Sequence, residues 1–271
     1  MSIRVGTRAS KLATTQSAGV VRRLRDITGL AVELVEIRTE GDVRTGSLAS
    51  LGGTGVFVVA LREALLAGRC DVAVHSLKDL PTAPVDGLWF VTPERENPRD
   101  ALCAAGGARL DTLPRGARVG TGSPRRVAQL RAVRPDLELV DIRGNVDTRL
   151  GRVFGPDADL DAVVLACAGL ARLGRTDAIS EVIDPAVIVP APGQGALAVE
   201  ARVAASGNAQ LAAALRALDH LPTHLAVTAE RAVLARLGAG CAAPVGAHAV
   251  VTGGELAIGA VVAGCCVRIV G

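Results

Sequence analysis

Asp79 is the first candidate for chemistry, because it follows a short apolar run, Val72-Ala73-Val74, that is typical of a buried strand. The residues between them, His75-Ser76-Leu77-Lys78, are mostly polar, and Pro81 comes soon after. In an open α/β sheet, ligands bind beyond the carboxyl ends of the strands, so these side chains are expected in a site. One Asp beside one Pro is also typical of a capped turn, and this stretch alone favours that simpler interpretation.

Two further stretches place basic side chains at the start of a predicted helix. In Gly6-Thr7-Arg8-Ala9-Ser10, Ser10 is the predicted N-cap of an amphipathic helix that ends near Gly29. In Ser123-Pro124-Arg125-Arg126, an N-cap precedes a proline suited to the first helical position and two guanidinium groups. Helix N-termini attract anions, so both stretches predict anion binding. A capped helix with a surface arginine explains the first stretch equally well.

Arginine is concentrated between Arg115 and Arg152, where nine arginines accompany four acids. Arg143-Gly144-Asn145 and Arg149 repeat the strand-to-helix arrangement in this region. Lys11 and Lys78 are the two lysines among 30 basic residues of the chain, so 28 are arginines. Guanidinium groups bind carboxylates and phosphates with two parallel hydrogen bonds, which predicts an anionic ligand. For several of these arginines, a solvated basic face is the simpler interpretation.

The six cysteines do not predict a zinc site or a disulfide framework, because no CxxC pair occurs and the four histidines do not cluster with them. Cys70, Cys103 and Cys167 lie in apolar contexts that are typical of buried thiols. Cys241 differs, since it lies among small residues, Gly240-Cys241-Ala242-Ala243-Pro244, on a predicted loop where a thiol is accessible. Taken alone, it would still more often be structural than reactive.

The composition predicts a globular protein of two or three domains, since 271 residues at 49% hydrophobic can bury a large core. We find no apolar stretch suited to a signal peptide or a membrane span, which predicts a cytoplasmic location. The chain has one Trp, three Phe and no Tyr. So few aromatic side chains argue against base stacking, and the sequence predicts no nucleic-acid partner.

The elements that must position these residues alternate between strands and helices. Strands are predicted at 3–5, 32–37, 72–74, 118–120, 137–142 and 162–166, with helices at 57–67, from 124, from 146 and at 223–237, and short strands around Gly253-Gly254. This βαβ rhythm predicts mostly parallel sheets. The proline-bounded stretches 93–100 and 190–195 are expected to cross between domains, and the glycine-rich stretch 40–55 is expected to be a lid-like loop.

Seven motifs together make the chain similar to the porphobilinogen deaminase family, also called hydroxymethylbilane synthases. They are Gly6-Thr7-Arg8-Ala9-Ser10, His75-Ser76-Leu77-Lys78-Asp79-Leu80-Pro81, Asn97-Pro98-Arg99-Asp100, Val119-Gly120-Thr121-Gly122-Ser123-Pro124-Arg125-Arg126, Arg143-Gly144-Asn145-Val146-Asp147-Thr148-Arg149-Leu150, Gly193-Gln194-Gly195-Ala196 and Gly240-Cys241-Ala242-Ala243-Pro244-Val245-Gly246. Each motif is weak alone, but all seven in this order are specific, and they span nearly the whole chain.

The resemblance implies an α/β fold of three domains. The first two, at 1–94 with 196–214 and at 99–190, are expected to resemble a hinged periplasmic-binding-protein pair with the active cleft between them, and a small α+β domain at 219–271 follows. The implied enzyme is a transferase that condenses four porphobilinogen molecules onto a covalently bound dipyrromethane, releases ammonia, and then releases linear hydroxymethylbilane by hydrolysis. A non-catalytic two-lobed binding protein for an anionic solute is the alternative.

The resemblance also implies a role for each matching residue. Asp79 would be the catalytic carboxylate, which stabilises cationic intermediates and passes protons, and Cys241 would hold the dipyrromethane cofactor through a thioether. The cofactor-binding residues would be Ser76, Lys78, Thr121, Ser123, Arg125, Arg126 and Arg149, and the substrate-binding residues would be Arg8, Ser10, Arg143, Asn145, Arg172 and Gln194. No metal is implied. The expected partners are porphobilinogen and the growing polypyrrole, with no membrane and no nucleic acid, and the expected state is a cytoplasmic monomer.

The sequence departs from the family pattern in three places. Ser50 and Thr54 stand where many relatives have lysines in the glycine-rich loop, and Gly122 stands where a serine is usual. The chain stops at Gly271, within what is predicted to be the third strand of the last domain, whereas relatives continue into further helices. We therefore expect an anion site with one hydroxyl fewer and an apolar face of the last domain that is left uncovered.

Overall fold

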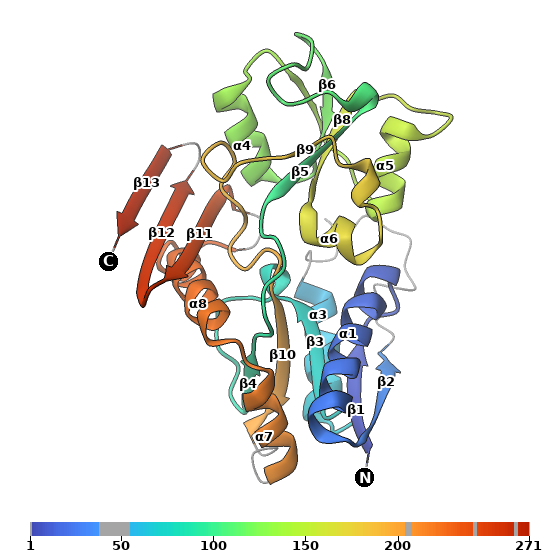
Figure 1. Cartoon of the computed structure of the whole chain (residues 1–271), viewed down its shortest axis with the longest axis vertical. Helices are drawn as coiled ribbons and strands as arrows, with labels where there is room; N and C mark the ends of the chain where they lie inside the picture. The colour runs from blue at the N-terminus through green and yellow to red at the C-terminus, as the bar shows by residue number, and fades with distance from the viewer. Residues whose placement is uncertain (1, 38–54, 204–207, 241–242, 263–264, 271) are drawn as a thin grey trace. The chain divides into compact units, whose positions relative to one another are not determined.

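The computed structural model describes residues 2–37, 55–203, 208–240, 243–262 and 265–270, and the chain divides into two units (Figure 1). Unit 1 comprises Met1–Arg95 and Ala196–Leu225, and unit 2 comprises Glu96–Gly195 and Ala226–Gly271. The chain leaves unit 1 after Arg95 and returns after Gly195, at the two proline-bounded stretches that the sequence predicts as crossings. Each unit is described separately below.

Unit 1 is built on a five-stranded sheet in the order β2-β1-β3-β10-β4. The strands are β1 (Ser2–Thr7), β2 (Ala31–Glu36), β3 (Val72–Ser76), β4 (Leu88–Val91) and β10 (Leu197–Arg202). β1 runs parallel to β2 and β3, but β10 runs antiparallel to β3 and β4. Because β10 is antiparallel to both of its neighbours, β4 points the same way as β1, β2 and β3, so the sheet is mostly parallel as predicted, with β10 as the exception. The returning chain enters beside the carboxyl end of β3, where Leu77 N donates to Ala196 O at 3.0 Å, and so β10 must run the opposite way.

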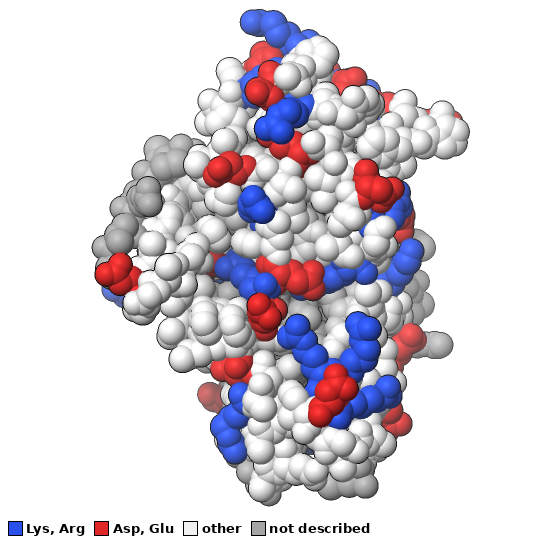
Figure 2. Space-filling model, viewed as in Figure 1, with Lys and Arg blue, Asp and Glu red and all other residues white. Residues whose placement is uncertain are grey.

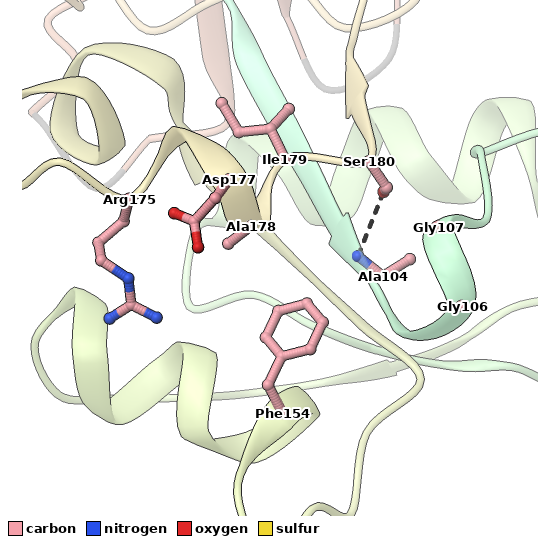
Figure 3. A pocket seen from close by; sticks show the side chains of 9 residues that line it. All are labelled: Ala104, Gly106, Gly107, Phe154, Arg175, Asp177, Ala178, Ile179 and Ser180. Atoms are coloured by element: carbon pink, nitrogen blue, oxygen red, sulfur yellow. Dashed lines mark hydrogen bonds between the residues drawn. The ribbon is translucent and has the colours of Figure 1, made fainter.

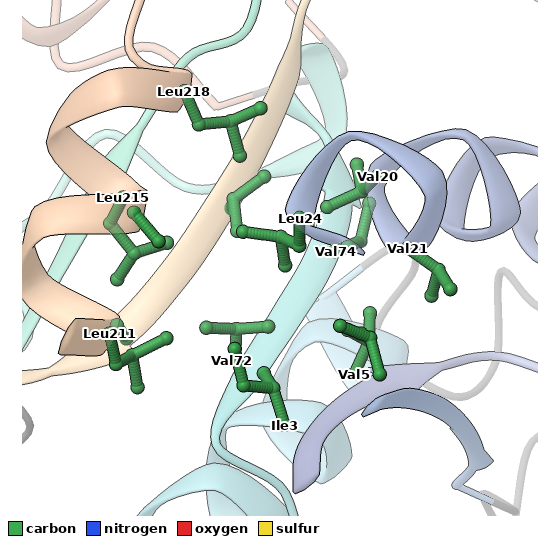
Figure 4. Close-up of a cluster of buried hydrophobic side chains, with 14 of the residues drawn as sticks. Ile3, Val5, Val20, Val21, Leu24, Val72, Val74, Leu211, Leu215 and Leu218 are labelled. Atoms are coloured by element: carbon green, nitrogen blue, oxygen red, sulfur yellow. The ribbon is translucent and has the colours of Figure 1, made fainter. Parts of the chain in front are cut away.

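Helices cover both faces of this sheet. On one face, α1 (Lys11–Thr28) and α7 (Ala209–Leu218) pack apolar side chains onto the strands, as Figure 4 shows. Ser10 is the N-cap of α1, and its side chain accepts a hydrogen bond from Ala13 N, as the sequence predicts. On the other face, α3 (Gly55–Leu66) packs Leu61 and Leu65 into a smaller cluster with Ala73 of β3. This burial on both faces explains why β3 reads as a continuous apolar run.

Unit 2 contains a second five-stranded sheet in the order β7-β6-β8-β5-β9. The strands are β5 (Asp100–Ala104), β6 (Arg118–Gly120), β7 (Glu138–Val140), β8 (Ala162–Ala166) and β9 (Glu181–Val182), and the helices are α4 (Pro124–Val133), α5 (Val146–Phe154) and α6 (Cys167–Arg172). β6 is parallel to β7 and β8, whereas β5 is antiparallel to β8 and β9. Leu130 of α4 packs on one face, and Leu150 and Leu170 pack on the other.

The last part of unit 2 contains most of α8 (Leu221–Arg236) and an antiparallel sheet of β11 (Val245–Thr252), β12 (Glu255–Val262) and β13 (Cys265–Val270). β11 and β12 are joined at Gly253 and Gly254, whose φ angles of 61° and 88° suit the tight hairpin that the sequence predicts. Glu230 of α8 is fully buried and accepts hydrogen bonds from Gly193 N and Ala249 N at 2.7 and 2.8 Å. It therefore ties α8 to both β11 and the returning chain.

Together, the two mixed α/β sheets and the small C-terminal sheet confirm the expected fold class. Two predictions lie outside the described residues, namely the lid-like loop at 40–54, with Ser50 and Thr54, and the thiol of Cys241. In the part of the chain that the structure describes, no helix is both long and apolar enough to cross a membrane.

Candidate active site

In unit 1, the predicted site residues lie at the carboxyl edge of the parallel strands. Asp79 ends a single helical turn, η2 (Leu77–Asp79), that follows β3 directly, and its side chain is half-buried. Leu77 is fully buried, and the amide of Leu80 donates back to Leu77 O at 3.1 Å. The turn is thus anchored by an apolar side chain and by backbone hydrogen bonds, and a carboxylate is presented at the position where α/β sheets bind ligands.

Other polar side chains reach the same edge because β1 and β3 are parallel neighbours. Arg8 follows the end of β1 and is half-buried, and Ser10 is exposed at the start of α1. Ser76 is hydrogen-bonded to Gln16 of α1, with the Gln16 Nε2 to Ser76 Oγ distance at 3.1 Å. Lys78 lies beside Asp79 in the η2 turn and is half-buried. Unit 1 therefore gathers a carboxylate, two cations and two hydroxyl groups at one edge.

In unit 2, Asp100 lies between the two guanidinium groups of Arg125 and Arg126. Arg125 Nη2 donates to Asp100 Oδ2 at 2.8 Å, and Arg126 donates to Oδ1 through Nη2 at 2.7 Å and Nε at 3.1 Å. Both arginine side chains are at most 7% exposed, and that of Asp100 is fully buried. Arg125 and Arg126 also donate to the carbonyl oxygens of Val189 and Val164.

The charges of this cluster do not cancel. Burial by itself would raise the pKa of Asp100, but the Arg125 and Arg126 guanidinium groups hold it far below its usual value, so this carboxyl group is ionised. Two guanidinium groups against one carboxylate leave an excess positive charge. Burial, together with the like charge of Arg126, lowers the pKa of Arg125 although Asp100 opposes the shift.

Arg149 adds to this crowding of positive charge. Burial, and then the like charges of Arg126 and Arg143, lower the pKa of Arg149, while Asp141 alone opposes them. Arg149 Nε donates to the carbonyl oxygen of Gly144 at 2.9 Å, which holds the guanidinium group near the start of α5. Repelling cations at a helix start are the arrangement expected of an anion site.

The remaining residues predicted in this region take local structural positions. Asn145 is the N-cap of α5 and accepts a hydrogen bond from Thr148 N at 2.8 Å. Ser123 is the N-cap of α4, and its amide lies 3.3 Å from Thr121 Oγ1. Thr121 itself is buried, and Arg143 is exposed with an ion pair to Asp141. The structure brings all of them to the strand-to-helix junctions of β6 and β7.

Arg172 and Gln194 are held close to the points where the chain crosses between units. Arg172 of α6 donates to Glu96 Oε1 at 2.9 Å and to the carbonyl oxygen of Gly195 at 2.8 Å. Gln194 is buried, and its Nε2 donates to Pro98 O at 2.7 Å and to Asp100 Oδ1 at 2.8 Å. Gln194 therefore connects the returning chain to the carboxylate that holds Arg125 and Arg126.

The structure gives a steric reason for the glycine at position 122, where the family pattern has a serine. A Cβ atom at this position would lie 2.5 Å from the carbonyl oxygen of Ile142 and 3.3 Å from Asp141 Oδ1. A backbone oxygen cannot move aside as a flexible side chain can, so a serine does not fit without local rearrangement. The hydroxyl that the family pattern expects here is thus excluded by the close approach of the segment after β7.

A cavity of about 340 Å³ in unit 2 is separate from these residues (Figure 3). Arg175, Asp177, Phe154 and Ser180 line it with the turn after β5, and none of the predicted site residues does. Ser180 Oγ accepts a hydrogen bond from Ala104 N at 3.2 Å and is committed to the fold. Among the described residues, no three His, Cys, Asp or Glu side chains are grouped to hold a metal ion.

Three of the cysteines, Cys70, Cys103 and Cys167, are unsuited to covalent chemistry. Cys70, Cys103 and Cys167 are free thiols in the cores of their units. Burial raises the pKa of all three, to about 12 for Cys103 and about 11 for Cys167. A thiolate is the reactive form, so these side chains are inert at neutral pH.

Sequence reasoning missed two residues of these clusters. Asp100 lies in the Asn97-Pro98-Arg99-Asp100 motif, which by itself predicts no role for it, although an acid in such an arginine-rich chain is a signal for a buried ion pair. Gln16 was passed over within the predicted helix. Its signal is a polar residue in the apolar stripe of α1, where Val20 and Leu24 are buried on the same face.

Comparison with known proteins gives matches over most of the chain. Residues 3–210 match the family described as porphobilinogen deaminase, dipyromethane cofactor binding domain, and residues 224–265 match porphobilinogen deaminase, C-terminal domain. The porphobilinogen deaminase of Micrococcus luteus is 60% identical, over 93% of this chain and 74% of that protein. The porphobilinogen deaminase of Cutibacterium acnes is also 60% identical, over 92% of this chain and 77% of that protein.

Among solved structures, a putative methionine-binding lipoprotein of Bacillus subtilis is similar at a TM-score of 0.47, with 11% identity over 81% of this chain and 90% of that one. The family assignment does not depend on this distant likeness. It depends on two family matches in the expected order and on relatives that are identical at more than half of the aligned positions. The chain belongs to the porphobilinogen deaminase family.

Proposed function

We propose that this hydroxymethylbilane synthase uses Asp79 as its catalytic carboxylate and the arginines of unit 2 to bind the carboxylates of cofactor and substrate. The observation that carries this proposal is the excess positive charge around Asp100, Arg126 and Arg149. Each porphobilinogen has an acetate and a propionate group, so a growing oligomer gathers many carboxylates. Guanidinium groups at helix starts are suited to that charge.

The dipyrromethane cofactor would supply the free pyrrole end to which substrate units are added. The donor set of unit 2 fits this group, because it offers guanidinium groups with too few acids to neutralise them. Within that set, Arg149 is the better candidate for direct contact with cofactor carboxylates. Arg143 is the better candidate for direct contact with substrate carboxylates. Arg125 and Arg126 are already bonded to Asp100, so they would act by their net charge and by their remaining N–H groups.

The proposed roles of the other residues follow from their placement. Thr121 and Ser123 would donate hydrogen bonds at the start of α4, and Ser76 and Lys78 would do so beside Asp79. For substrate, the proposed contacts are Arg8, Ser10, Asn145, Arg172 and Gln194. Because Asn145 and Gln194 already make structural hydrogen bonds, their contribution would be to position neighbouring groups.

Asp79 would act on charge that develops in the reaction. When ammonia leaves porphobilinogen, the remaining pyrrole carries positive charge, and a nearby carboxylate stabilises it. After the new carbon–carbon bond forms, the attacking ring loses a proton, which Asp79 is suited to accept. The η2 turn supports this role, since its buried Leu77 fixes the carboxylate at the sheet edge.

Cofactor attachment is proposed at Cys241. This thiol lies outside the described residues, but Cys70, Cys103 and Cys167 are buried and their thiols have raised pKa values. Their chemistry supports a different residue as the attachment point. That these three cysteines are not in disulfides also supports a cytoplasmic location.

The proposed partners are porphobilinogen and the growing polypyrrole, without a membrane or nucleic acid. Figure 2 supports this, because basic and acidic side chains are interleaved on the face drawn. Many arginines of unit 2 are neutralised by acids within the fold, for example Arg118 by Glu138 and Arg134 by Asp136.

We propose that the chain is a monomer with three domains. The first comprises residues 1–94 and 196–214, the second residues 99–190, and the third residues 219–271.

Replacing Asp79 by asparagine tests the catalytic proposal. The Asp79→Asn variant should fold and keep its cofactor but lose on the order of 100-fold or more in turnover, because the proton acceptor and the negative charge are gone. The measurement is the rate of porphobilinogen consumption, with intact mass and the colour reaction of an Ehrlich-type aldehyde reporting the bound cofactor. Near-normal turnover in a cofactor-loaded variant would remove Asp79 from the mechanism.

A further inference from the structure

A second buried cluster of charge lies beneath the Asp79 turn, on the face of the unit 1 sheet covered by α3. Glu200 of β10 accepts three hydrogen bonds from Arg62 of α3, between 2.8 and 3.1 Å in length. His75 of β3 places Nε2 at 3.3 Å from Glu200 Oε2, a contact that lacks hydrogen-bond geometry. The side chains of Glu200 and His75 are 3% exposed, and that of Arg62 is 13% exposed.

Nothing in the proposed chemistry uses these three residues, although such a cluster is costly to bury. Burial by itself would raise the pKa of Glu200, but His75 and Arg62 lower it, so the carboxylate is charged in the core. A buried carboxylate keeps that charge only while its partners stay in place. The cluster therefore penalises any arrangement of the strands that separates Glu200 from His75 or Arg62.

The apolar contacts between β3 and β10 do not by themselves determine how the two strands align. On the α1 face, the pair brings Val74 against Val199 and Val72 against Ala201. Small apolar residues specify register weakly, because a shift by two residues again places small apolar side chains together. On the α3 face, Glu200 lies opposite Ala73 and diagonal to His75, and this polar contact would be lost in the shift.

The register of β10 also determines the place of the catalytic turn. Leu77 N donates to Ala196 O at 3.0 Å, immediately before β10 begins, and Asp79 follows two residues later. A shift of two residues along a strand moves the backbone by roughly 7 Å. Even a fraction of that displacement would carry the Asp79 carboxylate away from the reacting atoms.

We propose that His75, Glu200 and Arg62 are positioning residues for Asp79. They fix the register of β3 against β10 from the α3 face, and the register fixes the η2 turn. This inference rests on the proposed catalytic role of Asp79, and it assigns no contact with substrate to the cluster. It adds three residues from three separate elements to those on which the reaction depends.

The test compares the two ends of β3. His75→Leu removes the polar contact at the catalytic end, and His75→Gln places a polar N–H group near the position of Nε2. The matched control is Asp71→Asn, which breaks the Arg4–Asp71 ion pair at the opposite end of the same strand, where the Nη2 to Oδ1 distance is 2.9 Å. The cofactor-loaded proteins are compared for kcat and KM with porphobilinogen, and for amide hydrogen exchange at Leu77 and at residue 71, whose amide donates to Arg4 O.

In His75→Leu, we expect kcat to fall on the order of 10- to 100-fold with little change in KM, as a misplaced catalytic group predicts. Exchange should accelerate at Leu77 but not at residue 71, and His75→Gln should recover most of both losses. Asp71→Asn should show the reverse exchange pattern with kcat unchanged. The proposal is overturned if His75→Leu keeps kcat and Leu77 protection, or if Asp71→Asn lowers kcat as much.

Two further comparisons keep the result interpretable. If His75→Leu does not fold, Glu200→Gln, which keeps the side-chain shape, must show the same fall in kcat and the same exchange at Leu77, or the proposal fails. Asp79→Asn is measured beside these variants. A fully active Asp79→Asn would defeat the proposed function itself, whereas an inactive Asp79→Asn with an unimpaired His75→Leu would defeat only the positioning role.

Discussion

Replacing Asp100 by asparagine should destabilise unit 2 strongly. Asp100 is fully buried and accepts hydrogen bonds from Arg125, Arg126 and Gln194, between 2.7 and 3.1 Å in length. The substitution keeps the shape of the side chain but leaves two buried guanidinium groups without a counter-charge. Removal of one partner from a buried ion pair costs about 3–5 kcal/mol. At roughly 2–4 °C per kcal/mol, the melting temperature should fall by roughly 6–20 °C.

The stability that Asp100 contributes depends on pH, and the direction of this dependence follows from its pKa. The pKa of Asp100 is far below its usual value in the folded protein, because Arg125 and Arg126 outweigh the effect of burial. A lowered folded-state pKa stabilises the protein at every pH above the unfolded value of about 3.9, and the contribution is lost as the pH falls further. The deficit of Asp100→Asn should therefore be complete at pH 7 and shrink in strong acid.

Thermal unfolding at neutral pH measures this deficit, with Asp159→Asn as the matched control. Asp159 also pairs with an arginine, Arg152, but at the exposed surface, so its loss should move the transition far less. Sulfate should raise the melting temperature of Asp100→Asn more than that of Asp159→Asn, because an anion can partly replace the missing carboxylate. If Asp100→Asn is as stable as the Asp159→Asn control, the claim that Asp100 stabilises unit 2 through its buried ion pairs is wrong.

Two further predictions concern the anion site of unit 2. Gly122→Ser should destabilise the protein by about 1–3 kcal/mol, because its Cβ would lie 2.5 Å from the backbone oxygen of Ile142. Urea unfolding measures this loss of stability. An unchanged urea midpoint would contradict the close approach of Ile142. Arg149→Gln should slow the loading of apoprotein with cofactor, followed by intact mass after mixing with porphobilinogen, whereas Arg152→Gln on the same helix should load normally. Equal loading rates for the two variants would show that Arg149 is not part of the anion site.

The sequence predicted much of the fold because local signals agree with the tertiary structure. β6 and β8 have the predicted bounds, and Ser10 is the N-cap of α1, as predicted. The sequence analysis predicts no strand where β10 lies, and the apolar pattern of β10 would not have distinguished its direction. That direction depends on where the chain returns from unit 2, which is a property of the whole topology.

The candidate site could be predicted in residue type but not in pairing. Arg125 and Arg126 were expected to bind ligand carboxylates, and the structure adds that they already share Asp100 from a distant strand. Spacing along the chain does not reveal such a partner. The same limit applies to Glu200 and His75, which meet only through the register of β3 and β10.

The central claim is that a sulfur-anchored pyrrole cofactor and one carboxylate carry out the reaction. Intact-mass measurement of the protein before and after addition of porphobilinogen tests it most directly. The account predicts that the unmodified sequence carries the extra mass of one dipyrromethane and gains further pyrrole units with substrate, and that Cys241→Ser has the mass of the bare polypeptide. A fully active protein with no added mass, or a Cys241→Ser variant that still carries the cofactor, would contradict it.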